Sequence, residues 1–305
     1  MYRLFRKHRF LLVFILFLGV VLLWKTDALV GSPGLRVHFF DVGQGDAEFF
    51  ETPGGKQVLI DGGPRQDVIR RLAQTMPFWD HSIDLVILTH PQLDHLSGLV
   101  PVLERYHVGS IMLNAASYKL DAYAALLNVV GQKNIPVVLA RAGEKITFDS
   151  GITAKILSPK EIVAEELFKE INESSIIVRL DYGKTSFLFT GDAGFPTEED
   201  LVSRDAFLDV DVLKVGHHGS KYASGETFLR AVSPRVAVIE VGAKNTYGHP
   251  TPETLSRLAA IGATIFRTDK DATVTLETDG KTVSRLFAKD YGIFRSVKSQ
   301  TLFEE

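Results

Sequence analysis

Two histidines and an aspartate lie within six residues of one another, in a segment that follows an apolar run. They are His90, Asp94 and His95, and the apolar run is 85–88. Pro91 biases His90 toward an extended backbone, so the three side chains can converge from one short loop. Imidazole and carboxylate together suit a divalent cation such as Zn, Mn or Fe. The spacing predicts a metal site; the alternative is a helix capped by Asp94, with two exposed histidines.

Further candidate ligands follow two later apolar runs. Asp192 comes after the run 186–189, and His217 and His218 stand between glycines after the run 210–215. A carboxylate that leaves a strand can bridge two metal ions, although Gly-Asp after a strand is more often a plain turn. The flanking glycines let the backbone and a ligand approach the histidine pair closely. We expect these residues to complete the site.

Other polar residues have more than one interpretation. His249 is a further ligand, a proton donor to the leaving group, or a loop residue bonded to backbone. Asp46 lies in a glycine-rich segment and either orients a ligand or belongs to a plain turn. The remaining histidines do not cluster, and we expect surface or structural roles for them: His8, His38, His81 and His107.

The elements that must position these residues form one α+β domain over residues 35–288, followed by a C-terminal tail at 289–305. Two meanders, each accompanied by helices, predict two packed sheets with helices on their outer faces. A polar, helical insertion is expected at 161–170. Strands are expected at 35–40, 47–51, 57–61, 85–88, 110–113, 137–139, 152–157, 176–180, 186–189, 210–215, 236–240, 264–266, 274–277 and 283–287. Helices are expected at 67–74, 99–105, 121–130, 226–232 and 252–260.

Composition limits the chemistry further. The chain has 305 residues, 45% of them hydrophobic, a formal net charge of −3 and no cysteine. This length suffices to bury one large core or two small ones. Without cysteine, both disulfides and thiolate metal sites are excluded, so His, Asp, Glu or amide oxygen must hold any metal. The net charge argues against a broadly basic surface, although a local basic groove for nucleic acid is compatible with it.

The first thirty residues differ from the rest. Four basic residues precede an uncharged apolar run at 10–24, and Lys25 ends it. As a helix, this run is shorter than a hydrocarbon core of about 30 Å, so spanning needs snorkelling or local thinning. We expect residues 1–30 to anchor the chain in a membrane, with the following domain outside the cytoplasm. The alternatives are a cleaved signal peptide, which gives a secreted or periplasmic protein, and a buried core helix.

Seven ordered segments resemble the metallo-β-lactamase superfamily, and within it the hydrolase domain at the C-terminus of the competence protein ComEC. They are FFDVGQGDA (39–47), LIDGG (59–63), the 90–95 loop, NESS (172–175), FTGD (189–192), DVLKVGHHGS (211–220) and YGHP (247–250). The resemblance implies an αββα sandwich with a metal site at the sheet edge. It implies one site from Asp94, His95, Asp192 and one or both of His217 and His218, with His90 in a second site.

Two positions depart from the superfamily pattern. Gln92 stands where the usual H-x-[HD]-x-D-H has its third ligand, and Asn172 replaces the histidine of the third motif. Neutral amide oxygens bind divalent ions less strongly than imidazole or carboxylate. We therefore expect one firm site for Zn or Mn and a second site that is weak, favours Mn²⁺, or is empty.

The mechanism that the resemblance implies is water activation. A bound cation lowers the pKa of water, and the resulting hydroxide attacks a phosphorus or carbonyl centre. Asp94 or Asp192 orients the hydroxide, and His249 or Lys214 assists the leaving group. The leading hypothesis is hydrolysis of phosphodiesters, with DNA as a candidate substrate. The alternatives are hydrolysis of another envelope ester, amide or lactone, and a degenerate binding module without turnover.

Overall fold

The structure is a computed structural model that describes residues 13–19, 34–114, 116, 118–160, 170–204, 206–291 and 294–304. Of the expected N-terminal apolar segment, it describes residues 13–19, which are helical. Across these described ranges, no helix is both long and apolar enough to cross a membrane. Residues 161–169 of the expected helical insertion lie outside the described residues.

The first sheet has nine strands in the order β16-β15-β14-β1-β2-β3-β4-β5-β6. Its strands β1, β2 and β3 form the antiparallel meander predicted from the sequence, whereas β3 to β6 run parallel. The bounds are β1 (Leu35–Phe39), β2 (Glu48–Glu51), β3 (Gln57–Ile60), β4 (Ser82–Leu88), β5 (His107–Leu113), β6 (Val137–Leu139), β14 (Val274–Thr278), β15 (Thr282–Tyr291) and β16 (Phe294–Glu304).

The second sheet has seven strands in the order β13-β12-β11-β10-β9-β8-β7. Strands β7 to β10 are antiparallel, and β10 to β13 are parallel. The bounds are β7 (Lys145–Thr147), β8 (Thr153–Ser158), β9 (Ile177–Tyr182), β10 (Thr185–Phe189), β11 (Val212–Lys214), β12 (Val236–Ile239) and β13 (Thr264–Arg267).

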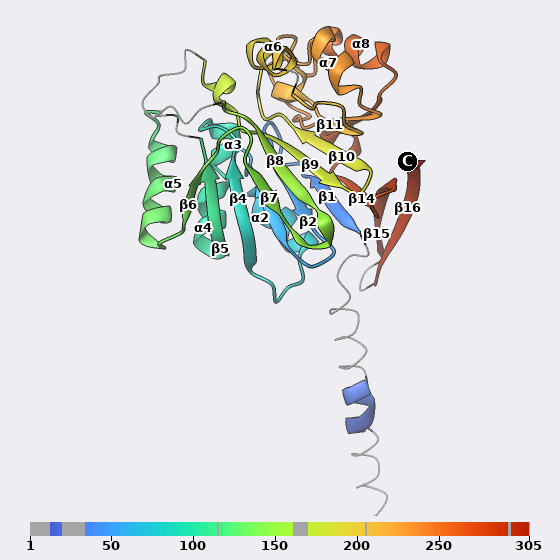
Figure 1. The fold of residues 1–305 in the computed structure, drawn as a ribbon. Helices are drawn as coiled ribbons and strands as arrows, with labels where there is room; N and C mark the ends of the chain where they lie inside the picture. The colour runs from blue at the N-terminus through green and yellow to red at the C-terminus, as the bar shows by residue number, and fades with distance from the viewer. Residues whose placement is uncertain are drawn as a thin grey trace, which may run out of the picture.

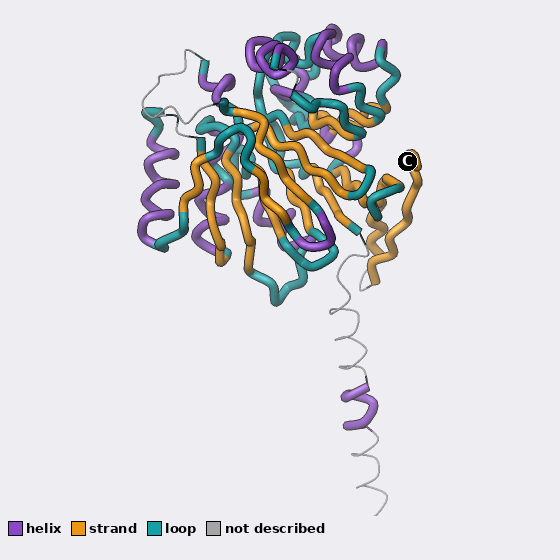
Figure 2. Tube along the Cα trace, viewed as in Figure 1, coloured by secondary structure: helices purple, strands orange, loops and turns teal. Residues whose placement is uncertain are grey.

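Helices cover the outer faces of both sheets (Figures 1 and 2). The nine-stranded sheet packs against α2 (Asp67–Thr75), α4 (Leu99–Arg105) and α5 (Asp121–Gln132), and the seven-stranded sheet against α6 (Phe195–Ser203), α7 (Glu226–Val232) and α8 (Pro252–Ala260). Shorter elements are α3 (Leu93–Leu96), α9 (Thr268–Asp271) and the 3-10 turns η1 (Asp149–Gly151), η2 (Ile171–Ser174) and η3 (Gly216–Gly219).

A central core lies between the two sheets. The rings of Phe39 from β1 and Phe189 from β10 stack there with centroids 6.0 Å apart. All four residues of β3 and all four of β12 are buried, because each of these strands has the core on one face and helices on the other. The expected αββα sandwich is confirmed.

The strands at the C-terminal end differ from the expected order. Strand β14 pairs with β1 in the first sheet rather than continuing the second meander, and β15 and β16 extend that sheet outward. The segment 289–305, expected as a tail, contains β16, which pairs along its length with β15. Local hydrophobic patterning identifies a strand but does not identify its neighbour, so the sequence could not assign these strands to a sheet.

His38 is the buried histidine of β1. Its Nδ1 lies 2.9 Å from Thr275 Oγ1, and the rings of Phe40 and Phe49 lie 5.9 and 6.0 Å away. Burial, together with the charge of Arg36, lowers the pKa of His38 to about 3. The folded protein therefore keeps this imidazole neutral at pH values where an unfolded chain protonates it.

We expect His38 to make stability fall as the pH drops from 7 to 5. Below about pH 6.5 the unfolded chain binds a proton that the folded protein does not. The free energy of unfolding therefore falls by up to about 2 kcal/mol between pH 7 and pH 5. Urea unfolding of the metal-free protein at both pH values should show a smaller loss for His38→Leu than for wild type. The exposed His107→Leu should behave like wild type. An unchanged pH dependence in His38→Leu contradicts the prediction.

Candidate metal centre

The candidate ligands all leave the C-terminal ends of strands that run parallel within the two sheets. Strand β4 leads into the loop that carries His90, Asp94 and His95, β10 leads to Asp192, and β11 leads into η3. Loops at the carboxyl ends of parallel strands gather at one sheet edge. The sandwich therefore brings loops from both sheets together.

Four of the predicted ligands form one cluster. Asp94, His95, Asp192 and His218 each offer a ligand atom, and these atoms lie within 4.8 Å of one another. Asp192 Oδ2 lies 3.4 Å from His95 Nε2 and 3.5 Å from His218 Nε2. His218 Nε2 is 3.3 Å from Asp94 Oδ2. All are buried except Asp94, whose side chain is 28% exposed, so Asp94 connects the cluster to the surface.

His95 is held by the buried carboxylate of Asp61. Its Nδ1 lies 2.7 Å from Asp61 Oδ2, and the same carboxylate accepts hydrogen bonds from the backbone N–H and hydroxyl of Thr89. Among the residues described, His95 Nε2 and Asp192 Oδ1 have no hydrogen-bond partner although both are buried. Buried polar atoms without partners are rare. An imidazole oriented by a carboxylate with its other nitrogen free fits a divalent metal ion.

His218 is oriented in the same way. Its Nδ1 lies 3.0 Å from the backbone carbonyl oxygen of Glu240 and 3.1 Å from Asp46 Oδ1. The turn η3 places His217 and His218 at φ 48° and 53°, in the left-handed region that non-glycine residues rarely adopt. This turn directs both imidazoles toward the carboxylates of the cluster.

Lys214 lies behind the cluster and does not reach the surface. Its side chain is fully buried, its ammonium contacts Asp46 Oδ2, and it donates to the Gly191 carbonyl at 2.8 Å. The interpretation of Lys214 as a group that assists the leaving group was therefore wrong, because its ammonium is committed to these partners. Asp46 orients His218, as one of its two sequence interpretations expected.

The ionisation of the cluster shows that it attracts positive charge. Burial by itself raises the pKa of Asp192, but His218 and His95 hold it well below its usual value. Burial by itself lowers the pKa of His218, but Asp192 and Asp46 raise it to about 10. The centre therefore favours a cation, either as protons on the imidazoles or as a divalent metal ion.

The residues expected in a second site lie beside the cluster. The buried ring of His90 is 4.2 Å from that of His95, and its Nε2 has no hydrogen-bond partner within the described part of the chain. Gln92 Nε2 donates to Asn172 Oδ1, so the two amides that replace the usual ligands bind each other. Asn172 Nδ2 in turn lies 3.4 Å from the His217 ring nitrogens.

His217 and His249 lie at the mouth of the cluster. His217 Nε2 is 3.7 Å from Asp192 Oδ2, and its side chain is 31% exposed. The half-buried His249 ring is 5.7 Å from that of His217. Burial and the charges of His217 and His218 lower the pKa of His249 to about 4, so it carries no spare proton at pH 7. This disfavours His249 as the proton donor to a leaving group.

Sequence reasoning gave no role to Asp61, Glu48, Glu240 or Asn245. Asp61 ends an apolar strand in the same way as Asp192, and that signal could have identified it. Glu48 and Glu240 form a buried acidic group with Asp46, but the Lys214 ammonium already serves as their cation. Nothing local marks these two glutamates as buried.

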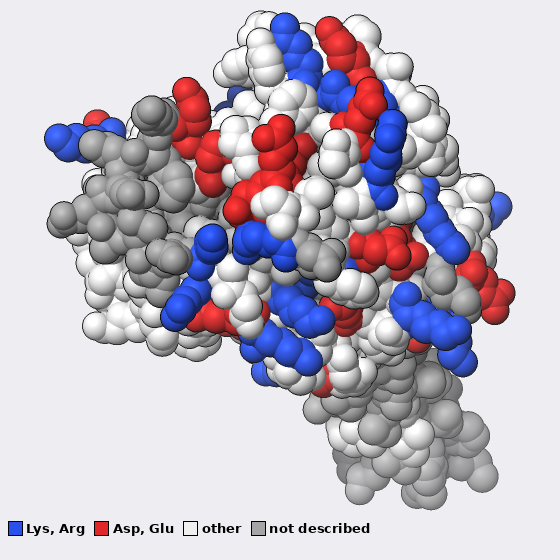
Figure 3. All heavy atoms as spheres, turned by 45° about the horizontal axis from the view of Figure 1, so that its top comes forward, with Lys and Arg blue, Asp and Glu red and all other residues white. Residues whose placement is uncertain are grey.

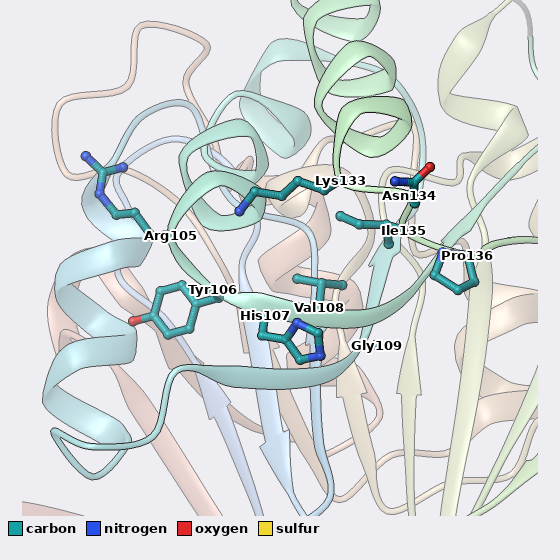
Figure 4. A pocket seen from close by; sticks show the side chains of 9 residues that line it. All are labelled: Arg105, Tyr106, His107, Val108, Gly109, Lys133, Asn134, Ile135 and Pro136. Carbon is teal, nitrogen blue, oxygen red and sulfur yellow. The ribbon is translucent and has the colours of Figure 1, made fainter.

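A separate surface pocket lies at the opposite end of the first sheet (Figure 4). It lies at the start of β5 and at the residues directly before β6. Its lining includes Arg105, Tyr106, His107 and Lys133. The candidate ligands leave the other ends of the strands. This pocket is therefore not part of the candidate metal centre.

Residues 41–242 match the Metallo-beta-lactamase superfamily. The chain belongs to that superfamily. It is 27% identical over 256 residues to ComE operon protein 3 of Bacillus subtilis, covering 78% of this chain and 32% of the relative. It is 29% identical over 248 residues to Recombination protein 2 of Haemophilus influenzae, covering 79% of this chain and 29% of the relative. The chain thus spans about a third of the length of these relatives.

Solved structures show the same fold. The metallo-beta-lactamase fold protein YhfI from Bacillus subtilis has a TM-score of 0.53 at 13% identity, covering 80% of this chain and 100% of that one. Zn(2+)-bound PqqB from Methylobacterium extorquens has a TM-score of 0.51 at 16% identity, covering 77% of this chain and 88% of that one. At these identities the likeness concerns the fold alone. Superfamily membership and the His/Asp cluster together support metal-dependent hydrolysis with a divalent metal ion.

We expect Asp61→Asn to weaken metal binding without unfolding the protein. The amide is similar in size but neutral, so it holds the His95 Nδ1–H less strongly, and loss of such an orienting carboxylate typically costs 10–100-fold in metal affinity. Isothermal titration with Mn²⁺ measures the change. The exposed Asp209→Asn, at the other end of β11, is the matched control. Unchanged affinity in a folded Asp61→Asn protein contradicts this role.

Restoring both missing ligands should create a strong second site. In Gln92→Asp combined with Asn172→His, a carboxylate and an imidazole replace the amide pair beside His90, and both bind divalent ions more strongly. The metal content, measured after gel filtration in Mn²⁺, should rise by one ion per chain relative to wild type. Gln132→Asp with Asn128→His, on the exposed face of α5, should not change the content. No rise in the double variant refutes the expectation.

Proposed function

We propose that this chain hydrolyses phosphodiesters, with DNA as its substrate, and that it uses one firmly held divalent metal ion. The observation that carries the proposal is the convergence of Asp94, His95, Asp192 and His218, with both imidazoles oriented by carboxylates. A divalent ion held there lowers the pKa of water toward neutrality and polarises a phosphoryl oxygen. Zn or Mn suits this set of nitrogen and oxygen donors.

The protein's own groups divide the remaining work. His95, Asp192 and His218 are buried and fixed by neighbouring side chains, so they serve as rigid ligands. Asp94 alone in the cluster is partly exposed, so its second oxygen is suited to orient an attacking water molecule and to accept its proton. His249 is neutral at pH 7 and is suited to a hydrogen bond with substrate rather than to proton donation.

A phosphodiester substrate is supported by the rim of the cluster. The segment 62–65 packs on the loop 90–95, since Gly62 N–H donates to the His95 carbonyl at 2.7 Å. Arg65 belongs to this segment, with a side chain 75% exposed, and Arg70 on the following helix is 55% exposed; both guanidiniums lie within 4 Å of Asp67. A guanidinium can bind a phosphate through two hydrogen bonds. On the face in Figure 3, Lys and Arg are interspersed with Asp and Glu. Contacts to the phosphate backbone of DNA therefore have to come from a few basic side chains rather than from a continuous basic surface.

DNA is favoured over other phosphodiesters because of the relatives. One of them is named Recombination protein 2, and recombination is a process that involves DNA. The contact between Gln92 and Asn172 fits a centre with one strong metal site. The same contact is the observation that favours the other candidate function, a binding module without turnover.

Asp94→Asn should reduce hydrolysis of both single-stranded DNA and bis(p-nitrophenyl) phosphate by at least about 100-fold, because the amide is a poorer ligand and accepts no proton. Rates are measured with Mn²⁺ and with Zn²⁺, by gel electrophoresis for the DNA and by absorbance for bis(p-nitrophenyl) phosphate. Asp209→Asn, far from the cluster, should match wild type. Wild-type protein that holds metal but cleaves neither substrate favours the binding module.

A further inference from the structure

Three aromatic rings lead from the candidate metal centre to the surface. The ring of His217, whose Nε2 lies 3.7 Å from Asp192, meets the ring of His249 edge to face, with centroids 5.7 Å apart. The ring of Tyr247 lies over that of His249 at 5.9 Å, with an angle of 27° between their planes. Tyr247 ends the series with 69% of its surface exposed.

The turn that carries Tyr247 is closed by one side chain. Asn245 Nδ2 donates to the carbonyls of Gly242 and His249 at 2.9 Å each, and Asn245 Oδ1 accepts from His249 N–H at 3.1 Å. These bonds fix His249 relative to the strand that precedes the turn, and the stacking contact places Tyr247 over it. Tyr is enriched at binding interfaces because its ring combines a large apolar face with a polar end, and Tyr247 presents such a ring beside the candidate metal centre.

We infer that Tyr247 stacks on a nucleobase of single-stranded DNA next to the phosphodiester held at the centre. This rests on the proposed function and deepens it, because it names single-stranded rather than duplex nucleic acid. Every base has a π-face that can lie on such a ring, whereas the bases of a duplex are already stacked on one another. The exposed Lys244, three residues earlier on the same turn, offers a cation for the adjoining backbone.

The test compares binding of two oligomers of equal charge. One is a fluorescein-labelled 12-mer of thymidylate, and the other is a 12-mer of the same backbone with abasic sites throughout. Fluorescence anisotropy is recorded with Ca²⁺ in place of Mn²⁺, and gels confirm that the oligomers stay intact. Wild type should bind the thymidylate more tightly than the abasic oligomer by about 5- to 150-fold, as expected for one stacked base.

Variants separate stacking from a merely structural role. Tyr247→Ala should remove most of the preference for the thymidylate, whereas Tyr247→Phe should keep it. Phe207→Ala is the matched control, because Phe207 is 64% exposed but precedes the opposite end of β11. It should keep the preference.

The inference is overturned if wild type does not distinguish the two oligomers, or if Tyr247→Ala keeps the full preference. It is also overturned if Tyr247→Ala weakens binding of both oligomers equally, since that result assigns Tyr247 a structural role. Because the readout is binding, a protein that cleaves no phosphodiester still tests the stacking, and the two failures stay distinguishable.

Discussion

The buried ion pair of Lys214 and Asp46 joins the two halves of the sandwich at the candidate metal centre. Asp46 belongs to the loop between β1 and β2 of the first sheet, and Lys214 ends β11 of the second. The Lys214 ammonium also donates to the carbonyl of Gly191, the residue directly before Asp192, at 2.8 Å. One side chain on β11 thus links two loops, one from each sheet. Removing one partner of a buried pair typically costs 3–5 kcal/mol, because the other charge is left unpaired.

Burial and the charges around this ion pair determine which neighbouring acids are ionised. Burial, and then the charges of the acids nearby, raise the pKa of Glu48 well above its usual value and that of Glu240 to about 8. Both are therefore largely protonated at pH 7. The pKa of Asp46 is lowered instead, since Lys214 and His218 outweigh its burial. One ammonium is thus matched with one carboxylate, and Asp46 remains charged to orient His218.

The contact between Gln92 and Asn172 gives this member of the superfamily an asymmetric centre. On one side lie two oriented imidazoles and two carboxylates that attract a cation. On the other side Gln92 donates one hydrogen bond to Asn172, and His90 directs an unpartnered nitrogen there, considering the described residues alone. A second metal ion would compete with this hydrogen bond for the oxygen of Asn172, and amide oxygens are weaker ligands than imidazole or carboxylate. Hydrogen bonding thus adds to ligand type as a reason to expect that a second site is weak.

The sequence by itself determined the local features. Helices α4, α7 and α8 and strand β6 lie at the predicted residues, because periodicity and turn residues act over a few positions. The proximity of His90, Asp94 and His95 was likewise readable, since one loop carries all three. The αββα class followed from the order of elements and the family resemblance.

Only the tertiary structure decided which distant residues meet. It paired β14 with β1, placed β16 at the sheet edge, set Asp61 against His95, and buried Lys214 against Asp46, 168 residues away in sequence. Whether a lysine reaches substrate or serves as a buried counter-ion depends on what covers it. No local pattern encodes that, because the packing of the two sheets creates both the burial and the partner.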